Sequence, residues 1–281
     1  MLRTKSHPIL SEYEELDGQP SVRRVDARTY LLETDRSQYL LQYATRPGRI
    51  HSSAHLMQSL RKRGFTNLVP IVLTTDGEPT VRGSGGEWFL QPLHPQARLE
   101  EGGQLRRLAR LLAACHCCAD DSEEGAMVHG QLTPEAVRSG PSGELLLDCW
   151  DGAGPGNAAD DLIFVLRLAA GRDEEEPASV LEAYAEVRNL RDGERDRLRD
   201  MLDHCSDPTL RNLAIPKPRG PLKEEPPGDL LARARTAAAD GKWTPSREEQ
   251  TVSTSEVTPE DTRDRPATDQ KEDPRQGGDE P

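Results

Sequence analysis

The order of apolar and polar residues along the chain predicts a strand-rich part first. Two runs with strand character, residues 28–33 and 37–43, flank a short polar turn and predict a β-hairpin. Apolar residues at helical spacing within residues 52–63, followed by a glycine, predict a helix. Two further strands are expected at residues 69–73 and 87–91. The expected order is therefore strand, strand, helix, strand, strand.

A helical part follows. Apolar stripes with the period of an α-helix predict four helices, at residues 104–118, 161–170, 179–189 and 193–205. Two short strand-like pieces, residues 126–129 and 144–148, interrupt this part and are joined by a polar segment rich in Pro and Gly.

The composition changes after Ile215. Residues 216–281 hold ten of the 22 prolines and few large apolar side chains, so we expect a disordered, acidic tail. Residues 229–241 are the exception, because their Ala, Leu and Arg content favours a short helix, either a transient one or a docking element. The sequence predicts an α+β protein with a sheet-rich part at 20–93, a helical part at 94–215 and the tail at 216–281.

Charge and composition limit the classes of function. The formal net charge is −13, from 36 basic and 49 acidic residues, which disfavours general binding of nucleic acid. The chain has no apolar run long enough to span a membrane, and residues 1–10 have none that suits a signal peptide. Five cysteines, an odd number, fit a reduced compartment better than a disulfide framework. We expect a cytoplasmic protein without membrane attachment.

Two clusters of reactive side chains need separate consideration. Residues 115–118 read Cys-His-Cys-Cys, which could indicate zinc, but adjacent ligands at one helix end point in different directions. We favour core packing of small thiols there. The run Asp173–Glu176 is most simply a solvated loop, and the alternative is an acidic patch that binds a cationic acceptor.

Four segments carry a resemblance to a known family. They are Val-His-Gly-Gln-Leu-Thr-Pro-Glu-Ala-Val at 128–137, Leu-Leu-Leu-Asp-Cys-Trp at 145–150, Asp161-Leu162, and the segment from Tyr184 to Leu202. Their order and spacing resemble the aminoglycoside-phosphotransferase branch of the protein-kinase-like fold, and within it the CotS-type spore-coat kinase-like proteins. The resemblance covers roughly residues 20–210 and implies a two-lobed fold with a cleft between the lobes.

The resemblance assigns roles to positions, and most of the residues found there do not suit them. Gln42 stands where the family has the strand lysine, and a neutral amide does not neutralise phosphate charge. Gln131 stands at the catalytic aspartate and provides no general base. Ala136 replaces the metal-binding asparagine. Asp148 matches the main magnesium ligand, but one carboxylate alone is a poor site for a hard cation.

Other residues of the motifs have less direct roles. Trp150 replaces the family's second acidic residue, and Asp151, one place further on, is a candidate displaced metal ligand. We expect His129 to brace the loop and Asp161 to accept hydrogen bonds from the loop backbone. Glu135 is a weaker candidate for the missing carboxylate.

We therefore predict a pseudokinase that acts as a binding or structural protein. The resemblance implies a place in spore-coat assembly, with coat proteins as partners and no bound cofactor. The alternative is an active small-molecule kinase that uses ATP and magnesium. Arg46 or Arg49 would then hold phosphates and Asp148, Asp151 and Gln42 would contribute to the nucleotide site. A third option is a nucleotide site used only as a switch. The sequence leaves the oligomeric state open.

Overall fold

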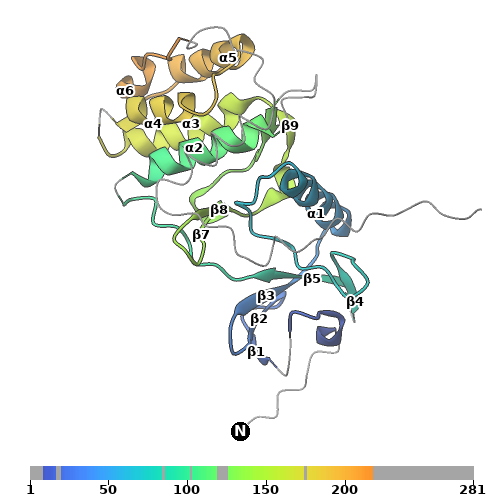
Figure 1. The fold of residues 1–281 in the computed structure, drawn as a ribbon. Helices are drawn as coiled ribbons and strands as arrows, with labels where there is room; N and C mark the ends of the chain where they lie inside the picture. The colour runs from blue at the N-terminus through green and yellow to red at the C-terminus, as the bar shows by residue number, and fades with distance from the viewer. Residues whose placement is uncertain are drawn as a thin grey trace, which may run out of the picture. The chain divides into compact units, whose positions relative to one another are not determined.

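The computed structural model describes residues 9–16, 20–83, 86–101, 103–118, 126–173 and 176–217 (Figure 1). Most of the predicted tail, with its short helix at 229–241, lies outside the described residues. The division of the chain at residue 93 into two parts stays a prediction.

A five-stranded antiparallel sheet forms the first part of the structure. Its strand order is β1-β2-β3-β5-β4, and the pairing of Leu31 with Leu40 in the middle of two neighbouring strands confirms the predicted hairpin. The expected strand at 87–91 is also confirmed. The strands are β1 (Ser21–Arg24), β2 (Thr29–Glu33), β3 (Gln38–Tyr43), β4 (Val81–Gly83) and β5 (Gly86–Pro92).

The predicted strand at residues 69–73 is wrong. This segment makes one isolated bridge, between Val72 and Leu90, and its neighbour Leu68 makes another with Leu147. Pro70 lacks a backbone N–H and interrupts any continuous ladder. The segment therefore runs from β8 (Leu145–Leu147) to β5 without joining either sheet as a strand.

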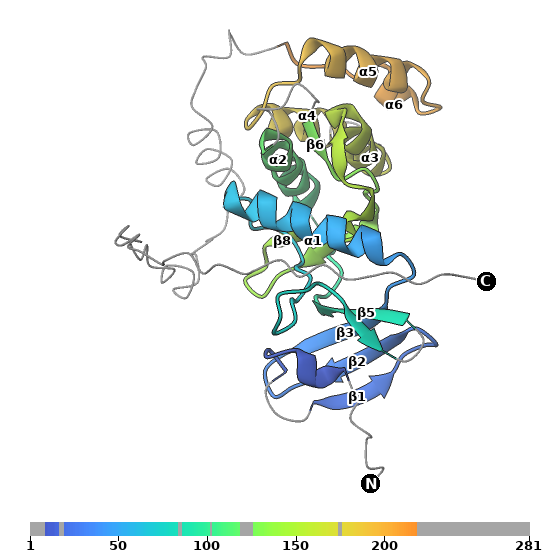
Figure 2. The same ribbon diagram turned by 90° about the vertical axis from the view of Figure 1, so that its right-hand side faces the viewer.

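Helix α1 (Pro47–Lys62) begins five residues before the predicted start at residue 52, because Pro47 suits the first turn of a helix. Its buried residues, Ile50, Met57 and Leu60 among them, belong to the core of the helical part. The sheet has a core of its own, which the N-terminal segment around η1 (Leu10–Glu12) completes. Helix α1 thus follows β3 in the chain and packs on the helical part (Figure 2).

The helical part confirms the predicted helices with shifts of a few residues at their ends. The chain forms α2 (Gln104–Cys117), α3 (Ala158–Ala170), α4 (Glu176–Ala185), α5 (Asp192–Asp203) and α6 (Pro208–Arg211). Two small two-stranded antiparallel sheets lie between α2 and α3: β6 (Ala126–Val128) pairs with β9 (Gly154–Gly156), and β7 (Val137–Ser139) forms a hairpin with β8. Among the described residues no helix is long and apolar enough to cross a membrane.

Candidate functional site

The motif residues gather where the β6–β7 loop meets the end of β8. The Asp148 N–H donates a hydrogen bond to the Ala136 carbonyl at 2.8 Å, so the two positions matched to metal ligands are neighbours in space. His129 and Gly130 follow β6, and the short helix η2 (Pro134–Ala136) leads into β7. The local fold therefore brings the loop and the strand end together, as the resemblance implies.

The Asp148 carboxylate is held by side chains from both parts of the protein. Arg138 Nε donates to Asp148 Oδ2 at 3.2 Å, and Gln91 Nε2 donates to Asp148 Oδ1 at 3.3 Å. The Cys149 N–H also donates to Oδ1, at 2.8 Å. Gln42 Nε2 in turn donates to Gln91 Oε1 at 3.1 Å. We name Gln42, Gln91, Asp148 and Arg138 the polar cluster.

The polar cluster does not fit a magnesium ion. A hard divalent cation needs several free oxygen ligands, and both Asp148 oxygens already accept hydrogen bonds, one of them from a guanidinium. Ala136, which is buried, supplies no side-chain oxygen. The positive charge of Arg138 stands where a cation would have to approach this carboxylate. As arranged, these residues stabilise one another rather than a metal.

His129 and Asp161 support the loop. His129 Nε2 donates to the Asp148 carbonyl at 2.5 Å, and its ring packs against Trp150 with centroids 5.1 Å apart. Asp161 accepts from the His129 N–H at 2.6 Å and from the Gly130 N–H at 3.0 Å. His129 thus links the loop to the end of β8, and Asp161 binds the loop backbone.

Gly130 is required by this loop geometry. Its φ angle is +77°, in the left-handed region, and a Cβ atom there would collide with the carbonyl oxygen of Gly152. The chain therefore turns sharply just before Gln131 and passes close to η3 (Trp150–Gly152).

A buried chain of polar side chains extends from Asp161 to α5. His116 Nε2 lies 3.1 Å from Asp161 Oδ2, and His116 Nδ1 lies 2.7 Å from the Tyr184 hydroxyl. Arg188 donates to that hydroxyl at 3.1 Å and forms a two-pronged ion pair with Glu194, both bonds 2.8 Å long. We name these five residues the buried relay. It joins α2, α3, the end of α4 and α5 to the motif loop.

The carboxylates of the buried relay are held in their charged form. Burial by itself raises the pKa of Asp161, but hydrogen bonds from His116 and from the His129 and Gly130 backbone outweigh it, so the pKa is lowered. The pKa of Glu194 is likewise lowered, because bonds from Arg188 and the Arg191 N–H outweigh desolvation. Burial raises the pKa of Tyr184, whose hydroxyl stays protonated.

Several predicted site residues lie outside the polar cluster. Gln131 is exposed beside Gly152, Asp151 is exposed on η3, and Glu135 is exposed on η2. Arg46 and Arg49 are exposed at the start of α1, and the cation beside Asp148 is Arg138 instead.

The cysteines near the site are poor nucleophiles in this arrangement. Cys149 follows Asp148 with φ +61°, and burial together with the Asp148 charge raises the pKa of its thiol to about 11. Cys115 and Cys118 are buried at the end of α2, and burial raises the pKa of the Cys115 thiol well above its usual range. Within the described ranges no three His, Cys, Asp or Glu side chains are arranged to hold a metal ion.

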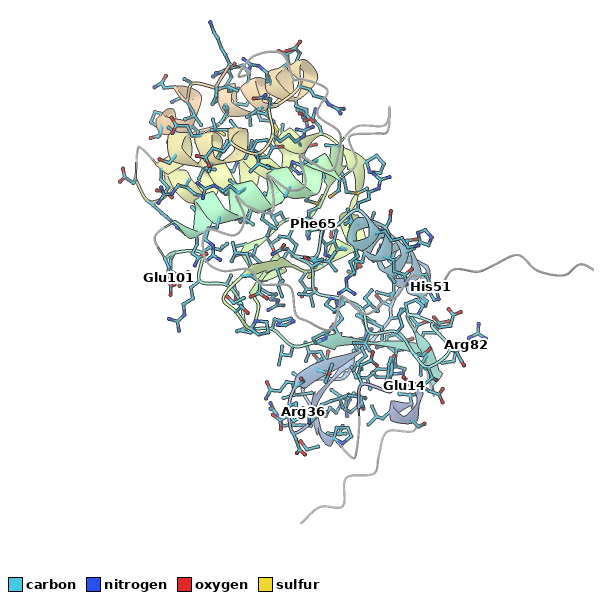
Figure 3. All side chains as sticks on the ribbon, viewed as in Figure 1. Glu14, Arg36, His51, Phe65, Arg82 and Glu101 are labelled. Atoms are coloured by element: carbon cyan, nitrogen blue, oxygen red, sulfur yellow. The ribbon has the colours of Figure 1, made fainter. Side chains whose placement is uncertain are left out.

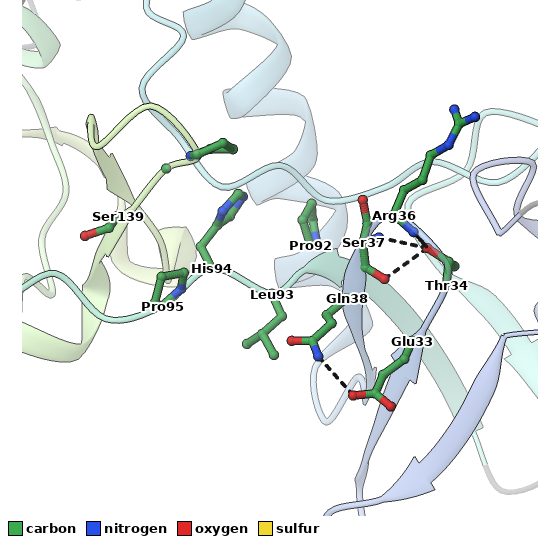
Figure 4. Close-up of a pocket in the computed structure, with 12 residues that line it drawn as sticks. Glu33, Thr34, Arg36, Ser37, Gln38, Pro92, Leu93, His94, Pro95 and Ser139 are labelled. Atoms are coloured by element: carbon green, nitrogen blue, oxygen red, sulfur yellow. Dashed lines mark hydrogen bonds between the residues drawn. The ribbon is translucent and has the colours of Figure 1, made fainter.

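A separate hollow of about 800 Å³ lies beside the linker that follows β5 (Figure 4). The β2–β3 turn, residues 92–95 and the β7–β8 turn line it, and it shares no lining residue with the polar cluster. His94 borders it, and burial lowers the pKa of this imidazole. Glu33 and Gln38 on its wall bond to each other at 2.9 Å.

Comparison with solved structures identifies the fold. An aminoglycoside phosphotransferase from Alicyclobacillus acidocaldarius superposes with a TM-score of 0.56 at 15% identity, covering 81% of this chain and 90% of that one. The chain has an aminoglycoside phosphotransferase-like kinase fold. The macrolide 2'-phosphotransferase MphH of Brachybacterium faecium gives a TM-score of 0.47 at 16% identity over 82% and 95% of the two chains. Choline kinase LicA of Streptococcus pneumoniae gives 0.44 at 13% over 78% and 93%.

Sequence comparison adds no closer relationship. No protein-family model and no curated protein matches this chain. The phosphotransferase-like fold therefore rests on the structure, and what the site does must be argued from its residues.

Proposed function

We propose that this protein is a pseudokinase, a kinase-fold protein that binds a partner and does not transfer phosphate. The observation that carries this proposal is the environment of Asp148. Its carboxylate is the one group of the expected catalytic set present in this sequence, and the Arg138 guanidinium and the Gln91 amide engage it. A side-chain cation thereby replaces the metal ion that phosphoryl transfer requires at such a carboxylate.

The strand lysine and its partner are both missing. In protein kinases the lysine of the third strand pairs with a glutamate of the following helix, and both are needed for activity. Here the strand position is Gln42, and α1 contains no acidic residue at all. The two losses are mutually consistent, because without a lysine on the strand a glutamate on α1 would have no positively charged partner.

The cellular role that we propose follows from the sequence resemblance. The motifs at 128–137 and 145–150 are similar to those of CotS-type spore-coat kinase-like proteins, which supports a role in spore-coat assembly in the cytoplasm, with a coat protein as partner. An intact fold whose polar cluster is neutralised internally suits a scaffold, since its shape does not depend on nucleotide.

Thermal-shift and phosphoryl-transfer assays with ATP and magnesium test the proposal. We expect a melting temperature shift of less than about 1 °C at millimolar MgATP, and no transfer above a control without protein. An assay that scores ADP formation independently of acceptor identity avoids the need to know a substrate. Magnesium-dependent turnover that disappears in Asp148→Asn would contradict the proposal.

One observation favours a second candidate, an active phosphotransferase with relocated groups. Arg138 places a permanent positive charge beside Asp148, and a guanidinium can bind phosphate oxygens in two-pronged fashion. In that case ATP would bind without magnesium, and Arg138→Gln would abolish binding. For a pseudokinase neither the wild type nor this variant binds ATP, so an ATP titration of the wild-type protein separates the candidates.

A further inference from the structure

Residues 36–75 differ in charge from the rest of the chain. They contain six Arg or Lys residues and no Asp or Glu, although 49 of the 281 residues are acidic, or about seven in every forty. A chain with a net charge of −13 therefore carries one segment that is purely basic. Helix α1 occupies the middle of this segment.

The basic side chains of α1 are exposed. His51, His55 and Lys62 follow one line along the outward side of the helix, at positions i, i+4 and i+11, while Arg49 and Arg61 lie on opposite sides of this line, at the borders of the buried side. Arg49, Arg61 and Lys62 carry the formal charge, because the histidines are counted as neutral. We name these five residues the α1 basic face. Helix α1 crosses the front of the view in Figure 2, and the His51 side chain points outward in Figure 3.

Helix stability does not explain this arrangement. Cations at the C-terminal end of a helix interact favourably with its dipole, which accounts for Arg61 and Lys62. Arg46, at the N-cap, and Arg49 lie at the opposite, positive end, where the dipole disfavours them and acidic residues are preferred. In the described part of the chain, none of these four residues forms an ion pair. Within the described fold, their charges are therefore not neutralised by an ion pair.

The acidic groups that border α1 are few. His51 Nε2 lies 3.6 Å from Glu78 Oε2, and Asp151 lies on η3, which packs against α1. The Glu78 contact lies near the N-terminal end of α1, and about 16 Å of helix separates His51 from Lys62, a span that suits a short extended segment.

We propose that the α1 basic face binds an acidic, extended segment of a partner protein. Charge complementarity favours a peptide over nucleic acid or an anionic membrane. With a screening length of about 8 Å at physiological salt, a short peptide on α1 experiences mainly the local basic charge. A long polyanion or a membrane also meets the acidic surroundings of a chain with net charge −13 and is repelled. The inference concerns the partner of the proposed scaffold and does not use the cleft.

Fluorescence anisotropy with a labelled poly-glutamate peptide of about twelve residues tests the proposal on the full-length protein. Poly-glutamine of equal length, a single-stranded DNA oligomer and vesicles with anionic headgroups are the comparison probes. We expect saturable binding of poly-glutamate that weakens as salt is raised, and weaker binding of each comparison probe. Binding of DNA or vesicles in preference to the peptide would overturn the choice of partner.

A charge-matched pair of variants locates the site. Arg49→Glu/Lys62→Glu reverses two charges on the α1 basic face, and Arg106→Glu/Arg167→Glu reverses two exposed charges on α2 and α3. We expect the first variant to raise the dissociation constant at least tenfold and the second to change it less than twofold. Equal losses in both would show that net charge alone attracts the peptide, and would overturn the proposal.

The test separates this inference from the proposed function. If Arg49→Glu/Lys62→Glu loses peptide binding while its response to MgATP is unchanged, the result bears on the α1 basic face alone. Phosphoryl transfer by wild-type protein would refute the pseudokinase and leave peptide binding to be judged on its own. Circular dichroism and urea unfolding of both variants show whether each is folded.

Discussion

Arg138 Nε lies 3.2 Å from Asp148 Oδ2; Arg138 lies in β7, and Asp148 directly follows β8, the partner strand of β7. Both side chains are mostly buried, with 24% and 12% of their surface exposed. We predict that Arg138→Gln and Asp148→Asn each lower the free energy of unfolding by about 1–2 kcal/mol, because each leaves a charged hydrogen-bonding group without its partner. Urea unfolding of both single variants and the double variant measures the coupling.

A coupling free energy of about 1 kcal/mol is expected from that cycle. Additive losses would mean that the pair contributes nothing, and Asp148 would then be available to other cations. Arg82→Gln is a suitable control, since its contact with Glu87 is 3.6 Å long and the Arg82 side chain is 92% exposed. We expect a change of less than about 0.5 kcal/mol there.

The buried relay makes the free energy of unfolding depend on pH in the acidic range. Asp161 and Glu194 have lowered pKa values in the folded protein, so their stabilising effect is complete above the unfolded values of about 3.9 and 4.3. It is lost as pH falls through the folded values. Urea midpoints measured from pH 7 to pH 3 should decline below about pH 4. The decline should be shallower in Asp161→Asn than in wild type, and a parallel decline would contradict this role.

The ion pair between Arg188 and Glu194 is deeper, with 4% and 7% of the side chains exposed. Removing one partner by Arg188→Met leaves a buried carboxylate and is expected to cost about 3–5 kcal/mol. The double variant Arg188→Met/Glu194→Leu should lose less than the sum of the two single variants, because it leaves no unpaired charge. Thermal unfolding of the wild type, the two single variants and the double variant tests this. A double variant whose loss of stability equals the sum of the two single losses would argue against direct pairing.

Gly130 and Gly143 form a matched pair for testing the motif loop. Both have φ near +78°, but a Cβ at Gly143 meets nothing within 4 Å, whereas one at Gly130 meets the Gly152 carbonyl. Gly143→Ala should cost about 1–2 kcal/mol through the backbone alone. Gly130→Ala should cost at least 1 kcal/mol more, because η3 or the loop must move. Equal losses of stability in the two variants would mean that the loop at Gly130 lies further from η3 than it does in the structure.

The local pattern of apolar and polar residues was sufficient to predict the elements that bury one regular face. Helix α2 has an uninterrupted apolar stripe, and the β2–β3 hairpin has its polar turn, so both were predicted with nearly correct ends. Strands β1, β4, β7 and β9 were missed. Each has three or four residues, too few for a period to be read, and each depends on its partner strand.

The site was predictable where one residue carried the signal by itself. Asp148, His129 and Asp161 were singled out by motif, and in the structure they are joined by hydrogen bonds through the His129 backbone and side chain. Arg138 and Gln91 were not found, because their roles arise only when β5 and the β7–β8 hairpin come together. For Arg138, the signal available in the sequence was its position directly after the apolar Ala136 and Val137. Arg188 and Glu194 were missed for a similar reason, since their pairing depends on the turn between α4 and α5.

Trp150 offers a built-in optical reporter of the site. Its indole N–H donates to the Leu147 carbonyl at 3.0 Å, and its ring contacts Phe65 and His129. The chain has only two other indoles, Trp88 and Trp243. Replacing those two with phenylalanine would leave a single emitter beside the Asp148 backbone, so that any rearrangement there can be followed by fluorescence without a label.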